Sequence, residues 1–98
     1  MSIHLDLRWV WDPTKAKVNE SDHGVSFAEE ATVLDDDRAI TREDSDSIGE
    51  QRFVTLGMSG NGNCIVVVYA WRGPATVRLI SAWRANARQR RLYAQDFG

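Results

Sequence analysis

Two strongly apolar runs in the second half of the chain dominate its hydrophobic pattern. The first extends from Cys64 to Trp71 and the second from Thr76 to Arg84, with Gly73-Pro74 between them. Both are rich in β-branched and aromatic residues, and both are so evenly apolar that we expect central strands covered on two faces. Residues 52–59 predict a third strand, joined to the first run by Asn61-Gly62, a strong signal for a two-residue hairpin turn.

This turn also sets the register that we expect for the hairpin. It places Met58 opposite Ile65, Leu56 opposite Val67 and Val54 opposite Tyr69. The result is three neighbouring antiparallel strands at residues 52–59, 64–72 and 76–84.

The first quarter of the chain predicts a strand and a helix. Apolar residues alternate from Ile3 to Trp11, which is typical of a short strand. Asp12 suits a helix N-cap and Pro13 suits the first helical position, so a helix should begin there, reach His23 and end at Gly24. One side of this helix should carry Lys15, Asn19 and Asp22.

A second helix and a short strand follow. Ser26 and Glu29 form a capping box that predicts a helix to about Leu34. The helical spacing places Phe27, Ala31 and Leu34 toward the sheet. A short strand is expected at 38–42 and an acidic, solvated loop at 43–50.

The arginine-rich segment from Asn86 to Tyr93 predicts the last helix, capped by Asn86 and Gln89. Elements in the order β-α-α-β-β-β-β-α predict an α+β fold, with an antiparallel sheet packed by helices. The length of 98 residues predicts one domain, residues 1–98.

Charge is divided unevenly between the two halves of the chain. Residues 1–50 hold 13 acidic and 5 basic residues, a balance of −8, whereas the second half holds seven arginines and one acid, a balance of +6. Arginine binds phosphate through two parallel hydrogen bonds and stacks on bases, which favours an anionic partner. The alternative is that the basic half pairs with the acidic half.

Composition makes several other classes improbable. No apolar run is long enough for a transmembrane helix, and Met1 to Val10 lacks a signal-peptide core, so we expect a cytoplasmic protein without a membrane partner. The single cysteine, Cys64, cannot form an internal disulfide and is expected to be a buried thiol. The two histidines, His4 and His23, have no paired metal-ligand spacing, so no metal or cofactor is expected.

A family resemblance extends over nearly the whole chain. Its motifs are Trp11-Asp12-Pro13, Lys15-Ala16, Asn19, His23-Gly24-Val25-Ser26-Phe27, Glu29-Glu30-Ala31, Glu50-Gln51-Arg52, Gly57, Val66-Val67-Val68-Tyr69, Arg78-Leu79-Ile80-Ser81-Ala82, Arg84-Ala85, Arg90 and Tyr93. In this order and spacing the chain resembles the BrnT toxin family.

The resemblance implies a fold like that of the RelE ribonucleases and a toxin of a type II toxin–antitoxin system. It implies a metal-independent endoribonuclease that inhibits translation and that a BrnA-type antitoxin neutralises. It also suggests a homodimer within the toxin–antitoxin complex.

RNA cleavage without a metal requires a base for the 2′-OH, an acid for the leaving oxygen and cations for the phosphorane. We therefore expect catalytic roles for His23, Glu50, Arg52, Arg78 and Arg84. RNA-binding roles are expected for Arg72, Trp83, Arg88, Arg91 and Tyr93. Two alternatives to these roles stay open. His23 could serve only to cap or pack the end of its helix, and the arginines could form structural ion pairs with the acidic half.

Two positions depart from the family pattern, which usually has Lys at position 22 and Arg at position 83. Asp22 and Trp83 each remove a cation, and Asp22 adds an anion. Weak or absent ribonuclease activity is therefore expected relative to typical family members, with antitoxin binding retained. The alternative function is a non-enzymatic binding module that uses its arginine-rich face to hold an acidic or antitoxin partner.

Overall fold

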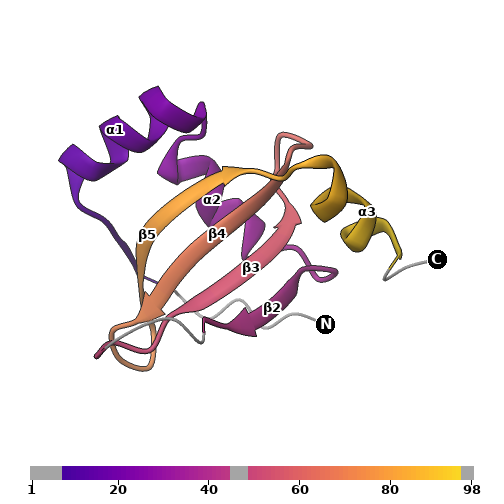
Figure 1. The fold of residues 1–98 in the computed structure, drawn as a ribbon. Coiled ribbons are helices and arrows are strands. Elements are labelled where there is room, and N and C mark those ends of the chain that lie inside the picture. Colours follow the sequence, from indigo (N-terminus) through magenta and orange to yellow (C-terminus); the bar gives the residue numbers. More distant parts are fainter. Residues whose placement is uncertain (1–7, 45–48, 96–98) are drawn as a thin grey trace.

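The eight elements follow one another in the predicted order (Figure 1). The computed structural model describes residues 8–44 and 49–95, so residues 3–7 of the expected first strand and 45–48 of the expected acidic loop lie outside the described residues. Within the described ranges, no helix is long and apolar enough to cross a membrane. The elements are β1 (Arg8–Val10), α1 (Pro13–His23), α2 (Phe27–Val33), β2 (Ile40–Glu43), β3 (Phe53–Met58), β4 (Cys64–Trp71), β5 (Thr76–Arg84) and α3 (Ala87–Gln95).

The strands form one sheet in the order β1-β5-β4-β3-β2. All neighbours are antiparallel except the edge strand β1, which runs parallel to β5. Six consecutive residues of β4 are buried, which confirms a central strand covered on two faces. β5 is also a central strand, between β1 and β4, as predicted. The expected cover on two faces was wrong for β5, because buried and half-buried residues alternate along much of the strand and one of its faces is only partly covered.

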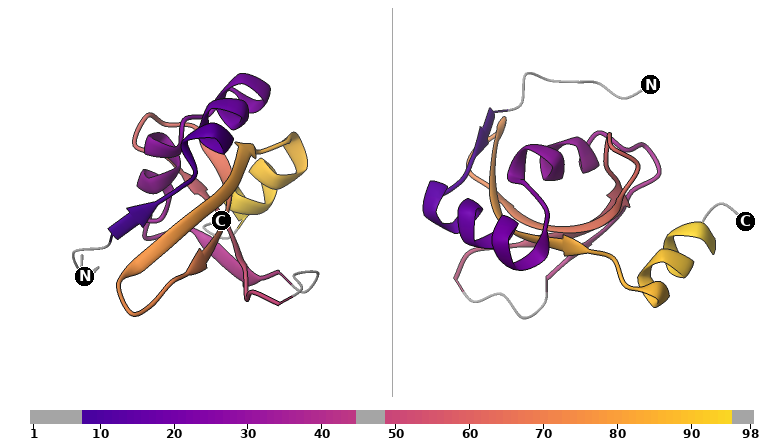
Figure 2. Two further views of the ribbon diagram at one scale, coloured as in Figure 1. Left: turned by 90° about the vertical axis from the view of Figure 1, so that its left-hand side faces the viewer. Right: turned by 90° about the horizontal axis from the view of Figure 1, so that it is seen from above.

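Helices pack on both sides of the sheet, but unequally. Figure 2 shows α2 inside the curve of the sheet and α3 on the other side, beyond the end of β5. The larger core, under α1 and α2, contains Val25, Phe27, Val33, Ile65, Val67, Tyr69, Val77, Leu79 and Ala82. The smaller core, beside α3, contains Leu56, Val66 and Ala85, with Ile40, Val54, Cys64, Trp83 and Tyr93 packed against it.

The predicted hairpin register was wrong by one residue. Met58 pairs with Cys64, and the shift continues along both strands. Gly62 N donates to Ser59 O, and Ser59 N donates to Asn63 O, so the loop has three residues rather than two. Gly62 has a φ of 82°, which is the left-handed position that such a loop requires.

Helix ends largely follow the sequence. The Asp12 carboxylate accepts a hydrogen bond from Thr14 N at 2.8 Å, and Gly24 ends α1 with a φ of 69°. In the α2 capping box, Ser26 accepts from Glu29 N as expected. The Glu29 side chain does not return the bond to the cap; it binds Ser59 and Asn63 of the β3–β4 hairpin instead.

Two other predictions were shifted along the chain. The buried residues of α2 are Phe27, Glu30 and Val33. Of the expected set, Phe27 is buried and Leu34 packs against the larger core, whereas Glu30 rather than Ala31 is the buried residue, because a charged residue was not expected among core positions. The short strand lies at Ile40–Glu43 rather than 38–42. Arg38 N donates to the Asp36 carboxylate, which holds that residue in a turn before the strand.

Candidate functional site

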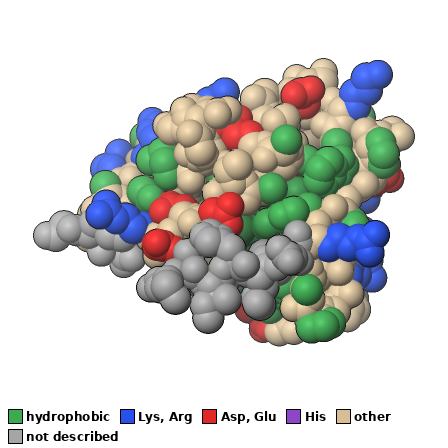
Figure 3. All heavy atoms as spheres, turned by 180° about the vertical axis from the view of Figure 1, so that it is seen from behind, with side chains coloured by type: hydrophobic (Ala, Val, Ile, Leu, Met, Phe, Trp, Pro, Cys, Tyr) green, Lys and Arg blue, Asp and Glu red, His purple; other side chains and the backbone are tan. Residues whose placement is uncertain are grey.

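Five arginines belong to the face of the sheet opposite α2. Residues that pair across neighbouring strands project to the same side of the sheet. Arg42 therefore projects to the same side as its partner Val54. Arg78 and Arg8 project to the same side as their partners, Ala70 and Thr76. Figure 3 shows the α2 side, where Lys and Arg side chains lie mainly near the outline of the molecule. We use the name arginine face for the side of the sheet that faces away from α2. Its arginines are Arg8, Arg42, Arg52, Arg72 and Arg78.

A carboxylate at this face binds two of the arginines. Glu50 Oε2 lies 2.8 Å from Arg72 Nη2, and Arg78 Nη1 donates to both Glu50 oxygens at 3.2 Å. Arg52 directly precedes β3, and extending the register by one residue would place it opposite Ala70, the residue that pairs with Arg78. Arg52 Nε is buried and has no hydrogen-bond partner among the described residues. Three guanidinium groups and one carboxylate leave excess positive charge, which suits a phosphate.

A groove of about 350 Å³ separates α1 from β5. β5 contains a bulge here: Val68 pairs with Ser81 but Tyr69 pairs with Leu79, which leaves Ile80 unpaired. Bulges re-aim side chains and are common beside active sites. The groove is lined by Thr14, Lys15, Val18, Asn19, Asp22, His23, Ile80 and Ser81.

Asn19 fixes the position of α1 against β5. Its Nδ2 donates to Val25 O, and its Oδ1 accepts from Ser81 Oγ and Ala82 N, both at 3.2 Å. Asn19 is buried, so these bonds hold the helix to the strand from within the groove. The predicted common side of Lys15, Asn19 and Asp22 is confirmed, because all three line this groove.

Arg84 lies apart from the arginine face. It pairs with Ile65, a residue of the larger core, so it projects to the α2 side of the sheet. A Cβ on Gly24 would lie 3.9 Å from Arg84 Nε, which places Arg84 at the C-terminal end of α1. Burial raises the pKa of Glu29, but hydrogen bonds from Ser59 and Asn63 and the charge of Arg84 outweigh burial and lower it.

Two of the expected RNA-binding aromatic residues pack in the smaller core. Trp83 is half-buried against it, and the Tyr93 hydroxyl donates to Asp36 Oδ2 at 2.6 Å. Burial, together with the Asp36 hydrogen bond and charge, raises the pKa of Tyr93 to about 12. Both residues therefore have a packing role in this fold.

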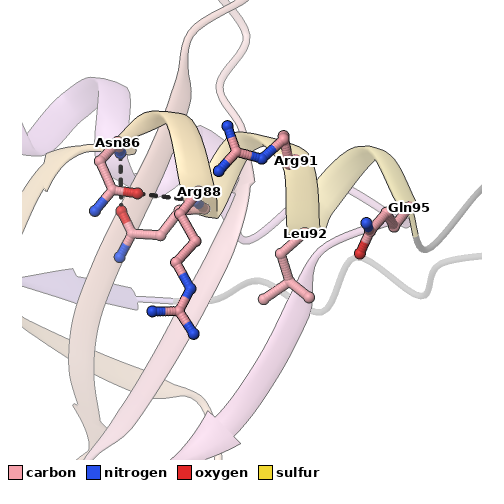
Figure 4. A pocket seen from close by; sticks show the side chains of 6 residues that line it. Asn86, Arg88, Arg91, Leu92 and Gln95 are labelled. Carbon is pink, nitrogen blue, oxygen red and sulfur yellow. Dashed lines mark hydrogen bonds between the residues drawn. The ribbon is translucent and has the colours of Figure 1, made fainter.

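The two arginines expected on α3 lie over an open pocket of about 570 Å³ (Figure 4). Arg88 and Arg91 flank Leu92, which is 52% exposed. Asn86 and Gln89 cap the helix reciprocally, as predicted, at 2.9 and 2.8 Å. Within residues 8–44 and 49–95, no group of three His, Cys, Asp or Glu side chains could hold a metal ion.

Comparison with known proteins identifies the family. The model of the family described as "Ribonuclease toxin, BrnT, of type II toxin-antitoxin system" matches residues 11–89. The chain belongs to the BrnT family. A comparison with curated proteins gave no match.

The fold agrees with that of a BrnT structure. The chain is similar to the crystal structure of the Brucella abortus ribonuclease toxin BrnT, with a TM-score of 0.64 and 22% identity, over 82% of this chain and 97% of the other. In this chain two clusters lie beside β5: the ion pairs of Glu50 with Arg72 and Arg78, and the groove that contains His23.

The structure therefore divides the expected catalytic residues. Glu50, Arg52 and Arg78 lie together on the arginine face, His23 lies in the groove, and Arg84 projects to the other side. Sequence reasoning overlooked Lys15 and Ser81 in the groove. The one-sided helix pattern and the Ser81 in the BrnT motif were the available signals. It also overlooked Arg8 and Arg42, whose alignment with the other arginines depends on the strand register.

Proposed function

We propose that this chain acts in the cytoplasm as a single-domain, metal-independent endoribonuclease that arrests translation by cutting RNA. Membership of the BrnT family supports the reaction class. The observation that supports the chemistry is the convergence of Arg72 and Arg78 on Glu50, beside a groove that contains His23 and Lys15.

In the proposed reaction the 2′-OH of the substrate attacks the neighbouring phosphorus, and the 5′-oxygen leaves with a 2′,3′-cyclic phosphate behind it. Glu50 is proposed as base or acid at this phosphate, because it binds Arg78. His23 is proposed as its partner but is supported less, because α1 ends near Arg84, at the other end of the groove. Arg52 and Arg78 stabilise the charge that develops on the phosphorane, which requires donors fixed in advance. Arg84 is the least supported member of this set, because it projects to the α2 side of β5.

RNA contacts are proposed for Arg72, Trp83, Arg88, Arg91 and Tyr93. Arg72, Arg88 and Arg91 are exposed, so they can reach phosphates that pass over the arginine face and α3. Trp83 and Tyr93 would contact RNA only with the edges that their packing leaves open.

The test is to incubate the purified chain with RNA in excess chelator. We expect products that end in a 2′,3′-cyclic phosphate. Replacing one charge-stabilising donor typically costs about 10²–10³ in rate, so Arg78→Ala should lose at least the lower figure. Lys17→Ala is the control, because Lys17 is an exposed cation that does not line the groove of His23. Cleavage that stops on chelation would refute metal independence.

We also propose that a BrnA-type antitoxin neutralises the toxin by covering its basic half, in a complex that contains two toxin copies. Complementary charge favours such an association. Co-expression with the neighbouring reading frame should yield one co-purifying complex. Co-purification without RNA cleavage by the isolated chain would instead favour the non-enzymatic binding module.

A further inference from the structure

The groove between α1 and β5 has a defined direction. Val10 of β1 pairs with Arg78, and α1 begins three residues later. Asn19, in the middle of α1, binds Ala82, and Gly24, at its end, lies near Arg84. The helix therefore runs alongside β5 in the same direction. Lys15 lies toward Arg78, and Asp22 lies toward the end of β5.

The two ends of the groove carry opposite charges. Lys15 and Asp22 are seven residues apart on α1, which corresponds to roughly 10 Å along the axis at about 1.5 Å per residue. Neither side chain has a hydrogen-bond or ion-pair partner within the described ranges, so both are available to a ligand. Between them lie Val18, which is 54% exposed, and Ile80, which the bulge presents.

These dimensions and charges match one nucleotide. A phosphate fits the Lys15 end of the groove, which is the end toward Arg78, and apolar Val18 and Ile80 can contact a planar base. The Watson–Crick edge of the base then meets Asp22. A carboxylate only accepts hydrogen bonds, through two oxygens. Guanine is the one RNA base with two adjacent N–H donors on this edge, whereas adenine, cytosine and uracil place acceptors beside their donors.

We propose that the groove between α1 and β5 is a guanine-nucleotide subsite for the RNA strand, in which Asp22 accepts the guanine N–H groups and Lys15 binds the phosphate. This inference rests on the proposed ribonuclease function and specifies its substrate. It gives Asp22 a role in base recognition, where the usual family residue would be a cation.

The test is to titrate the chain with 5′-GMP, 5′-AMP, 5′-CMP and 5′-UMP and to follow binding by calorimetry and by NMR shifts at Val18 and Ile80. We expect GMP to bind at least about fivefold more tightly than the others, since a charged acceptor gains from two donors. Asp22→Asn should reduce that preference to about twofold or less, because Asn offers only one acceptor oxygen. Asp37→Asn, an exposed acid outside the groove, should leave it unchanged.

A second pair of variants tests the other end of the groove. Lys15→Ala should weaken binding of all four nucleotides to a similar extent and leave binding of unphosphorylated guanosine unchanged. Lys17→Ala should change neither. Equal affinities for the four nucleotides, no binding, or a GMP preference that survives Asp22→Asn would each overturn the subsite.

The RNA-cleavage assay and the nucleotide titration distinguish failure of the proposed ribonuclease function from failure of the guanine subsite. If RNA stays intact in chelator while the Asp22-dependent GMP preference holds, the catalytic proposal fails and the subsite stands. If RNA is cut but nucleotide binding shows no preference, the subsite fails and the catalytic proposal stands.

Discussion

Glu30 is a carboxylic acid in the core of the domain. Its side chain has no exposed surface, and neither oxygen has a hydrogen-bond partner among the described residues. Burial raises its pKa from 4.5 to about 8. At neutral pH the folded chain therefore keeps Glu30 mainly protonated, whereas the unfolded chain ionises it.

The sign of the resulting pH dependence follows from the raised pKa. The contribution of Glu30 to stability is fully present below about pH 4.5 and is lost as the pH rises to about 8. The loss is on the order of 3–5 kcal/mol at about 1.4 kcal/mol per pKa unit. We expect Glu30→Gln to remove this slope and to exceed the wild type in unfolding free energy at pH 8. Denaturant titrations at several pH values measure both, and parallel curves for the two proteins would contradict the prediction.

Gly57 is required by close packing rather than by backbone conformation. A Cβ at this position would lie 3.0 Å from both Val33 Cγ1 and Ala39 Cβ. We expect Gly57→Ala to destabilise the fold by about 1–3 kcal/mol, as overpacking does elsewhere. Gly60→Ala is the matched control, since its nearest neighbour, Thr32 Cβ, would lie at 3.6 Å. A thermal scan that ranks the two variants equally would disprove the packing argument.

At the scale of elements, local signals in the sequence predicted the elements and their order but not their exact register. Asn61-Gly62 marked the hairpin correctly, yet a two-residue type I′ turn requires a positive φ at both of these residues. Of the two only Gly62 adopts it, and every pair in β3 and β4 shifts by one. This shift could not be read from the strands, because both faces of β4 are apolar.

The candidate site was harder to predict than the fold for the same reason. Its arginines come from separate strands, and their common face follows only from the register. Glu50 was recognisable as a charged residue near the site, but its bonds to Arg72 and Arg78 connect segments more than 20 residues apart in sequence. The groove depends on the bulge at Ile80, which no turn or glycine signal in the sequence marks.

The helix α3 has few attachments to the rest of the domain. None of its residues is fully buried, and the Tyr93 hydroxyl bond to Asp36 connects it to the segment before β2. We expect Tyr93→Phe to cost about 0.5–1.5 kcal/mol, the usual value of one hydrogen bond. The loss should appear as faster amide hydrogen exchange in α3. Leu92→Ala, at an exposed position, serves as the control, and unchanged exchange in Tyr93→Phe would show that packing alone holds α3.

At the scale of the whole molecule, the charge asymmetry was expected to serve either an anionic partner or pairing between the two halves of the chain. The structure contains part of each. Glu50 of the acidic half pairs with Arg72 and Arg78, and Arg84 lowers the pKa of Glu29 by its charge. Arg88 and Arg91 nevertheless remain on an open surface of α3. Internal pairing therefore holds part of the basic half in place, while the rest of it stays accessible to an anionic partner.

The two departures from the family pattern should consequently have different effects. Asp22 lines the groove, whereas Trp83 packs against the smaller core. A small shift would not let Arg84 replace the missing cation at position 83, because the two residues project to opposite sides of β5. The two single changes Asp22→Lys and Trp83→Arg therefore test the two positions separately.

We expect Asp22→Lys to remove the preference for guanine, because Lys cannot accept the guanine N–H groups. It should nevertheless strengthen overall RNA binding and growth arrest, because it replaces an anion with a cation beside a polyanionic strand. The added cation should also steepen the salt dependence of RNA binding by about one unit of slope. Trp83→Arg should instead lower the unfolding free energy by about 1–2 kcal/mol, since a half-buried ring is replaced by a charged side chain, without increasing growth arrest. Growth curves and salt titrations of the three proteins provide the measurement. Stronger growth arrest from Trp83→Arg would show that this position faces the RNA, and a wild type that is already fully toxic would show that Asp22 does not weaken the site.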